Sequence, residues 1–123
     1  MYLLDSNILI YSSKEEFAFL RKYITSETAI SAVSVTTVIE VMGYHQLAPK
    51  DKTYFESCFA LLQQFEVDYL IATKAVELRQ QRKRSLGDAI IAATALIHDC
   101  ELVTRNIADF QDIPYLKVHN PFP

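Results

Sequence analysis

The chain has little glycine, with two residues among 123, and it has only four prolines. Disordered segments and flexible linkers are usually rich in such residues, so the composition argues against both. Half of the residues are hydrophobic and 22% are charged, which is ordinary for a compact protein. We therefore expect a single domain over residues 1–123, long enough to bury one sizeable core.

Residues that bind zinc are also scarce. The two cysteines, Cys58 and Cys100, lie far apart in hydrophobic surroundings, where both resemble small buried hydrophobic residues. There is no CxxC spacing, and His45, His98 and His119 are scattered along the chain. The sequence therefore argues against a zinc site of the Cys/His kind.

Long hydrophobic runs are absent as well. No stretch approaches the length of a membrane-spanning helix, and charged pairs interrupt the N-terminal region, so we expect no signal peptide, no membrane span and a cytoplasmic location. The net charge of −3 argues against a protein that coats nucleic acid by bulk attraction. A local basic patch is still compatible with that charge.

Short hydrophobic strands alternate with helical segments along the chain. Strands are predicted at residues 2–4, 28–33, 101–104 and 115–118, and Val67 and Tyr69 alternate as in a further strand. Helices are predicted within residues 14–24, 35–47, 51–65, 73–85 and 86–100. This alternation is typical of βαβ units, so we predict an α/β fold whose central, mostly parallel sheet is covered by helices on both faces.

The helical patterns also predict which side chains are buried. The segment 86–100 is hydrophobic nearly all round and should lie against the sheet. Within 51–65 the aromatic residues are expected in the core rather than on a partner-binding face: Tyr54, Phe55, Phe59 and Phe65. Within 35–47, which Ser34 should cap, the residues expected to face inward are Val35, Val38, Ile39 and Met42. The residues expected on its other side are Thr36, Thr37, Glu40 and Tyr44.

Four acidic residues recur where predicted strands end and helices begin. Asp5 follows the first strand, Glu40 lies in the helix after the second, Asp88 opens the helix from residue 86, and Asp109 follows the strand 101–104. Each has an ordinary explanation, as a cap of a helix or turn or as a solvent-facing residue. In a parallel sheet, however, these segments gather along one edge, where the four side chains can converge.

Carboxylates that converge repel one another, and the cluster is tolerable only if it holds cations or is partly protonated. Oxygen ligands with no nearby His or Cys favour Mg²⁺ or Mn²⁺. The chemistry indicated is hydrolysis of a phosphodiester by a metal-bound water. A phosphatase with an aspartyl nucleophile is a weaker alternative, because such enzymes usually carry a second aspartate two residues on, where this chain has Asn7.

Four segments carry a family resemblance over essentially the whole chain: YLLDSNILI, SAVSVTTVIEVMGY, LGDAIIAATAL and LVTRNIADF. In this order and spacing they resemble a PIN domain, specifically the toxin ribonucleases of the VapC type. The resemblance implies a PIN-like three-layer α/β/α sandwich and a magnesium-dependent endoribonuclease of a type II toxin–antitoxin pair. It further implies a homodimer, a cognate antitoxin protein and an RNA substrate, commonly transfer or ribosomal RNA.

The family's acidic residues correspond here to Asp5, Glu40 and Asp88. Many PIN domains place a fourth acid where this chain has Asn106, so Asp109, three residues further on, is the candidate for that role. The resemblance also implies residues that orient the carboxylates or the water bound to the metal: Ser6, Asn7, Thr104 and Asn106. The departure at Asn106 supports an alternative, a catalytically degenerate PIN-fold binding module.

A basic segment directly precedes Asp88. Its cations are Arg79, Arg82, Lys83 and Arg84, and Arg105 lies beside Asn106. Cations at a helix C-terminus can simply complement the helix dipole. Because a polyanionic substrate needs a cationic guide past an acidic pocket, we favour RNA binding for this cluster.

Overall fold

A computed structural model describes residues 1–28 and 30–123. One parallel sheet in the order β3-β2-β1-β4-β5 contains β1 (Tyr2–Leu4), β2 (Ser31–Ser34), β3 (Gln63–Phe65), β4 (Glu101–Val103) and β5 (Val118–His119). The helical segments are α1 (Ser6–Ser12), η1 (Glu15–Arg21), α2 (Lys22–Thr25), α3 (Val35–Met42), α4 (Pro49–Leu61), α5 (Tyr69–Gln81), α6 (Leu86–Ile97) and η2 (Ile107–Asp109). The predicted α/β fold with a central parallel sheet is confirmed.

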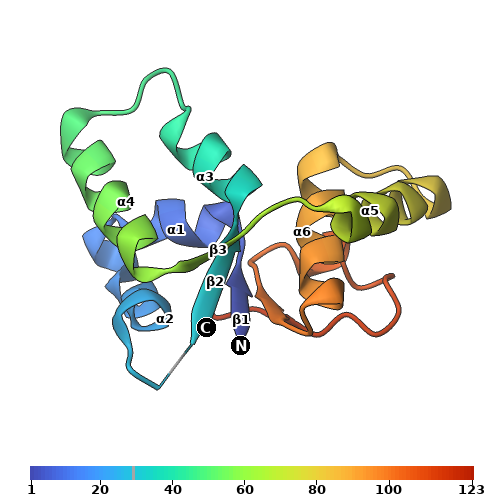
Figure 1. The fold of residues 1–123 in the computed structure, drawn as a ribbon. Helices are drawn as coiled ribbons and strands as arrows, with labels where there is room; N and C mark the ends of the chain where they lie inside the picture. Colours follow the sequence, from blue (N-terminus) through green and yellow to red (C-terminus); the bar gives the residue numbers. More distant parts are fainter. Residues whose placement is uncertain (29) are drawn as a thin grey trace.

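The sheet separates two hydrophobic cores, because neighbouring residues of a strand point to opposite faces. The residues Leu3, Ala32 and Leu102 enter one core, and Leu4, Val33 and Val103 enter the other. Figure 1 shows α5 and α6 on one side of the sheet and α1 to α4 on the other. Cys58 and Cys100 are free and buried, one in each core, as predicted.

The path of the chain reverses at the middle of the sheet. From β1 the chain adds β2 and then β3 on one side, and it returns through α5 and α6 to add β4 on the other side of β1. In open α/β sheets, such a reversal leaves a crevice at the carboxyl ends of the two strands, where ligands bind. Asp5 and Thr104, which directly follow β1 and β4, both lie at this crevice.

Helix α6 is buried against the sheet, as its composition predicts. Seven of its twelve residues are buried, Ala89 through Ala95. The hydroxyl oxygen of Ser85 caps the helix by accepting a hydrogen bond from the Asp88 amide at 3.1 Å. Asp88 is the third residue of the helix, so the alternative explanation of Asp88 as the helix cap does not hold, because Ser85 takes that place.

The expected faces of α3 are partly wrong. Ser34 caps this helix as predicted, but Thr37 is fully buried and Ile39 is 66% exposed. Thr37 and Val41 are four residues apart, so they share one side of the helix, and this is the side that packs against α1 and α4. Ile39 lies away from that contact and faces solvent.

The segment between α4 and α5 also departs from prediction. Helix α4 ends at Leu61 rather than at Phe65, and residues 63–65 form β3, which pairs with β2. Val67 and Tyr69 belong to no strand, since Asp68 caps α5 by accepting a hydrogen bond from the Ile71 amide at 2.9 Å. The pairing of β3 depends on its backbone, so its polar side chains give no strand pattern.

Smaller differences concern the ends of elements. The strand predicted at 28–33 is β2, Ser31–Ser34, and residue 29 of the predicted stretch lies outside the described residues. The helix predicted within 14–24 is a 3₁₀ segment with a kink at Phe17, followed by α2. Helix α5 ends at Gln81, so residues 82–84 lie outside it, with extended backbone at Arg82. The last strand is Val118–His119 rather than 115–118.

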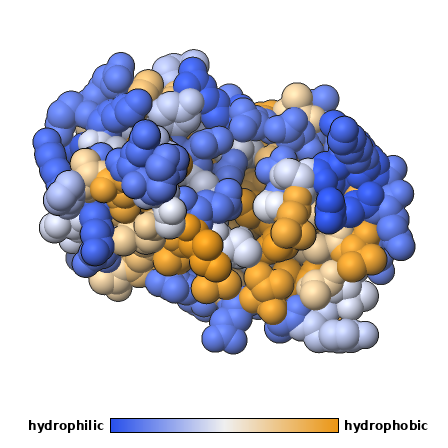
Figure 2. Space-filling model, turned by 90° about the horizontal axis from the view of Figure 1, so that it is seen from above, coloured by the Kyte–Doolittle hydropathy of each residue, from blue (hydrophilic) through white to orange (hydrophobic). Residues whose placement is uncertain are grey.

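Several hydrophobic side chains of α3, α5 and α6 remain exposed. Ile39, Val76 and Leu86 are 66%, 56% and 60% exposed, and together with Val67 and Ile90 they line two adjoining hollows. We call these five residues the apolar surface. Figure 2 shows hydrophobic side chains gathered between hydrophilic regions on the face seen from above.

No helix in the described part of the chain is long and apolar enough to cross a membrane.

Candidate active site

Asp5 is a buried carboxylate at the crevice between β1 and β4. Its side chain is 7% exposed, and its Oδ2 accepts a hydrogen bond of 2.8 Å from the hydroxyl of Thr104, which is fully buried. The Thr104 hydroxyl in turn accepts a hydrogen bond of 3.1 Å from the Asn106 amide. Asp5 occupies the N-cap position of α1 but makes no side-chain capping bond, so capping does not explain this residue.

Glu40 reaches the same region from α3. Ser6, the first residue of α1, donates a hydrogen bond of 3.1 Å to Glu40 Oε1. The Glu40 carboxylate also lies next to Gly87 in the first turn of α6, with Oε1 3.7 Å from the place where a Cβ atom of residue 87 would stand. The three helices α1, α3 and α6 therefore meet at this carboxylate.

The pKa values of Asp5 and Asp88 are both raised, and the other predicted acids contribute to these shifts. Burial raises the pKa of Asp5, and the charges of Asp88 and Glu40 raise it further, against the lowering effect of the hydrogen bond from Thr104. Burial also raises the pKa of Asp88, with a further contribution from Asp109. The charges of Asp88 and Glu40 thus act on Asp5, and the charge of Asp109 acts on Asp88.

Asp88 and Asp109 line a hollow of about 570 Å³ together with the basic segment. We call it the acidic–basic hollow; its lining residues are Arg79, Arg82, Lys83, Arg84, Ser85, Asp88 and Asp109. Asp109 is exposed at the end of η2, and Asn106 is exposed just before it. The basic segment, which directly precedes Asp88 in the sequence, thus also lines the same hollow as Asp88 in the structure.

The predicted cations differ in their surroundings. Arg79 and Lys83 are exposed, and the Arg82 side chain is 47% exposed. The Arg84 side chain is only 4% exposed, and its Nε donates a hydrogen bond of 2.9 Å to the Leu78 carbonyl in the last turn of α5. Arg105 lies elsewhere on the same edge, with its guanidinium carbon 4.3 Å from the centre of the Phe122 ring.

Two residues of this region were not predicted from the sequence. Ser85 could have been found, because a serine three residues before an acid is the signature of a capped helix start. Asp112 could not, because it binds Arg82 and Arg84 across 30 and 28 residues of sequence and matches no local pattern. Asn7, a position that the family resemblance implied, is exposed in the first turn of α1.

The acidic set suits a divalent cation by its chemistry. As the side chains stand, no three His, Cys, Asp or Glu residues in the described part of the chain are grouped closely enough to hold a metal ion. Oxygen donors favour Mg²⁺ or Mn²⁺, and a dication would favour the charged forms of Asp5 and Asp88, reversing the effect of burial on their pKa values.

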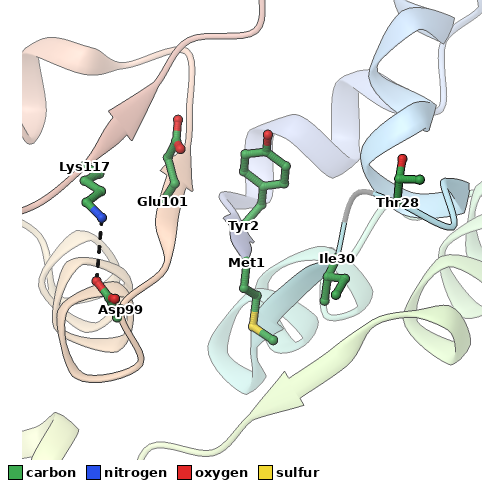
Figure 3. A pocket seen from close by; sticks show the side chains of 7 residues that line it. All are labelled: Met1, Tyr2, Thr28, Ile30, Asp99, Glu101 and Lys117. Carbon is green, nitrogen blue, oxygen red and sulfur yellow. Dashed lines mark ion pairs between the residues drawn. The ribbon is translucent and has the colours of Figure 1, made fainter.

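A second hollow, of about 340 Å³, lies at the opposite edge of the sheet. Tyr2 and Glu101, the first residues of β1 and β4, line it, and Lys117 faces Asp99 across it at 3.9 Å. Figure 3 shows these side chains around the starts of the strands. None of the predicted site residues lines this hollow.

We expect Asp5→Asn to stabilise the metal-free protein at neutral pH by about 1 kcal/mol, the size of a typical single-residue effect. Asparagine keeps an acceptor for Thr104 but removes the charge. Because the pKa of Asp5 is raised by folding, the free energy of unfolding falls as pH rises from the ordinary carboxyl pKa through the raised one. The gain should therefore shrink in acid, as measured by urea unfolding with chelator at both pH values.

Asp99→Asn is the matched control, because it removes the same charge from an exposed ion pair at the other edge. It should change the free energy of unfolding by less than about 0.5 kcal/mol at either pH. If Asp5→Asn instead destabilises the protein equally at both pH values, the charge of Asp5 is not the source of strain.

The sequence and the fold match proteins of one family. A profile of the PIN domain matches residues 2–114. The chain is 31% identical to "Ribonuclease VapC10" of Mycobacterium tuberculosis over 127 aligned positions, which cover 95% of this chain and 91% of that protein.

Solved structures agree. A toxin–antitoxin complex from Klebsiella pneumoniae contains a chain that is 34% identical, with a TM-score of 0.78 over 99% of this chain and 98% of that one. A chain of VapBC2 from Rickettsia felis, bound to a DNA fragment from its promoter, shares the fold at 20% identity, with a TM-score of 0.81 and 97% of each chain covered. The resemblance found in the sequence is confirmed, and the chain belongs to the PIN domain family.

Proposed function

We propose that this protein is a metal-dependent endoribonuclease that hydrolyses RNA phosphodiester bonds as the toxin of a type II toxin–antitoxin pair. The observation that carries the proposal is the linked set of carboxylates at the crevice between β1 and β4, centred on buried Asp5. The relative from Mycobacterium tuberculosis bears the name ribonuclease, and the alignment with it covers 95% of this chain. A nuclease needs such an acidic set in a place that a polyanion can enter.

Within this proposal, Asp5, Asp88 and Glu40 would hold Mg²⁺ or Mn²⁺, and Asp109 would help to hold a second ion. A bound dication would activate water for attack on the phosphorus and neutralise charge on the phosphate. Thr104 fixes the orientation of the Asp5 carboxylate, and Ser6 fixes that of Glu40. Asn7 and Asn106, exposed at the same edge, supply hydrogen bonds to bound water or substrate.

The test is cleavage of end-labelled RNA by the purified protein with Mg²⁺, with Mn²⁺ and with chelator. Asp5→Asn should lower the rate by at least about a hundredfold, because the metal supplies several kcal/mol of transition-state stabilisation and each 1.36 kcal/mol is about a factor of ten. Asp99→Asn, at the opposite edge, should cut like the parent. Equal cutting by Asp5→Asn and the parent would refute this role of Asp5.

A catalytically degenerate binding module is the competing function, motivated by Asn106 at the position where many relatives carry an acid. It predicts no cutting of any RNA and no binding of Mn²⁺ by calorimetry. Metal binding and metal-dependent cutting by the parent protein would eliminate it.

The exposed cations of the acidic–basic hollow are proposed to bind RNA phosphates. Arg79 and Lys83 are the principal candidates, because both are exposed and line the hollow beside Asp88. Arg82 contributes through its exposed part, while Arg84 supports the segment from its buried position. Arg105, stacked on Phe122, extends the cationic surface along the same edge.

Arg79→Gln with Lys83→Gln should weaken RNA binding without changing the fold. The slope of log affinity against log salt should become shallower by about 0.7 for each phosphate of single-stranded RNA that the protein no longer neutralises. Binding titrations at several salt concentrations measure this slope. Lys117→Gln, at the other edge, is the control and should leave the slope unchanged. An unchanged slope in the double variant would mean that the basic segment is an ordinary solvated surface.

The proposed partners are an antitoxin protein and a second copy of this chain. The antitoxin is inferred from the likeness to the Klebsiella pneumoniae toxin–antitoxin complex. The second copy is assigned to the apolar surface, because exposed hydrophobic side chains from three helices converge there and such patches mark protein interfaces.

Val76→Glu should convert a dimer of this kind to a monomer, because it places a charge in the middle of a contact that excludes water. Sedimentation measures the change. The control is Leu61→Glu. Leu61 is a hydrophobic residue of α4 that is 66% exposed and lies outside the apolar surface, so its replacement should leave the mass of the assembly in solution unchanged. A parent protein that sediments as a monomer at all concentrations would refute the homodimer.

A further inference from the structure

Asp112 binds two arginines that line the same hollow as Asp88 and Asp109. Its Oδ1 accepts a hydrogen bond of 2.9 Å from Arg82 Nη1, and its Oδ2 accepts one of 2.8 Å from Arg84 Nη2. Asp112 lies in the loop between η2 and β5, whereas both arginines lie between α5 and α6. One carboxylate therefore holds two cations of a different segment at the rim of the site.

Arg84 cannot remain unpaired. Its side chain is 4% exposed, so its charge has little access to water, and a buried cation without a partner is strongly disfavoured. Its hydrogen bond to the Leu78 carbonyl engages Nε, whereas the other two guanidinium nitrogens are the ones turned to Asp112. If Asp112 lost its charge, those two nitrogens would need another anion.

The other anions that line the same hollow are two acids of the proposed metal site. Asp88 and Asp109 line the acidic–basic hollow together with Arg82 and Arg84. Arg84 lies four residues before Asp88 in the chain, and both residues line this hollow. A guanidinium pairs well with a carboxylate through two parallel hydrogen bonds, and it would then compete with a metal ion for the same oxygens.

We propose that Asp112 is a positioning residue that withholds Arg82 and Arg84 from Asp88 and Asp109, and so keeps these two carboxylates accessible to a divalent cation. The inference rests on the proposed metal-dependent function. It assigns to Asp112 no contact with the metal or with RNA. Its effect passes through the two arginines.

The test is calorimetric titration of the full chain with Mn²⁺ alone, without RNA. Asp112→Asn should weaken Mn²⁺ binding by about tenfold, within the range of coupling between residues in one ion-pair network. Asp112→Glu, which restores a carboxylate, should recover most of the affinity. Asp99→Asn is the matched control, because it neutralises an acid paired with a cation outside the site, and it should bind Mn²⁺ like the parent.

The decisive comparison removes Arg84 in both backgrounds. Arg84→Gln should change the affinity little when Asp112 is present, but it should restore most of the lost affinity in Asp112→Asn. A simple loss of negative charge, or a loosened loop, would lower the affinity by the same factor with or without Arg84. Thermal unfolding of each variant accompanies the titration, and Arg82→Gln replaces Arg84→Gln if the latter does not fold.

The outcomes separate this inference from the proposed function. Unchanged Mn²⁺ affinity in Asp112→Asn would overturn the role of Asp112 alone, and so would a reduced affinity that removal of neither arginine relieves. A parent protein that binds no Mn²⁺ would overturn the proposed metal-dependent function and this inference with it. Recovery of affinity in the double variant would support both.

Discussion

The hydrogen bond from Thr104 to Asp5 joins the ends of the two central strands, and the candidate site depends on it. Asp5 follows β1 and Thr104 follows β4, so this bond of 2.8 Å lies where the path of the chain reverses. Both residues are buried, which makes the carboxylate expensive to charge. The charges of Asp88 and Glu40 add to this cost, because they raise the pKa of Asp5 beyond the effect of burial.

Two further acids come from helices that cover opposite faces of the sheet. Glu40 comes from α3 on one face and Asp88 from α6 on the other. Ser6 at the start of α1 donates a hydrogen bond to the Glu40 carboxylate, and Ser85 caps α6 by accepting one from the Asp88 amide. Basic side chains lie beside Asp88 and Asp109, in the lining of the acidic–basic hollow. Asp112 pairs with two arginines, Arg82 and Arg84, that line the same hollow as Asp88.

The sequence allowed those candidate site residues to be proposed that stand out from their immediate neighbours in the chain. A carboxylate directly after a hydrophobic strand, as at Asp5, or in the first turn of a hydrophobic helix, as at Asp88, is visible in a single stretch of residues. The errors fall where a side chain's environment is set by distant elements. Thr37 is buried because α1 and α4 cover it, and β3 is a strand because its backbone pairs with β2.

The parallel α/β fold and the acidic residues at one sheet edge follow from the amino-acid order alone, because alternation of hydrophobic residues and the succession of elements are local properties. Which charged side chains interact with one another depends instead on the tertiary structure. Asp112 joins Arg82 and Arg84 across 30 and 28 residues of sequence, and Asp5 is linked with Glu40 and Asp88 from two other helices. Such contacts arise only when the chain closes on itself, since electrostatic attraction and burial act between neighbours in space rather than in sequence.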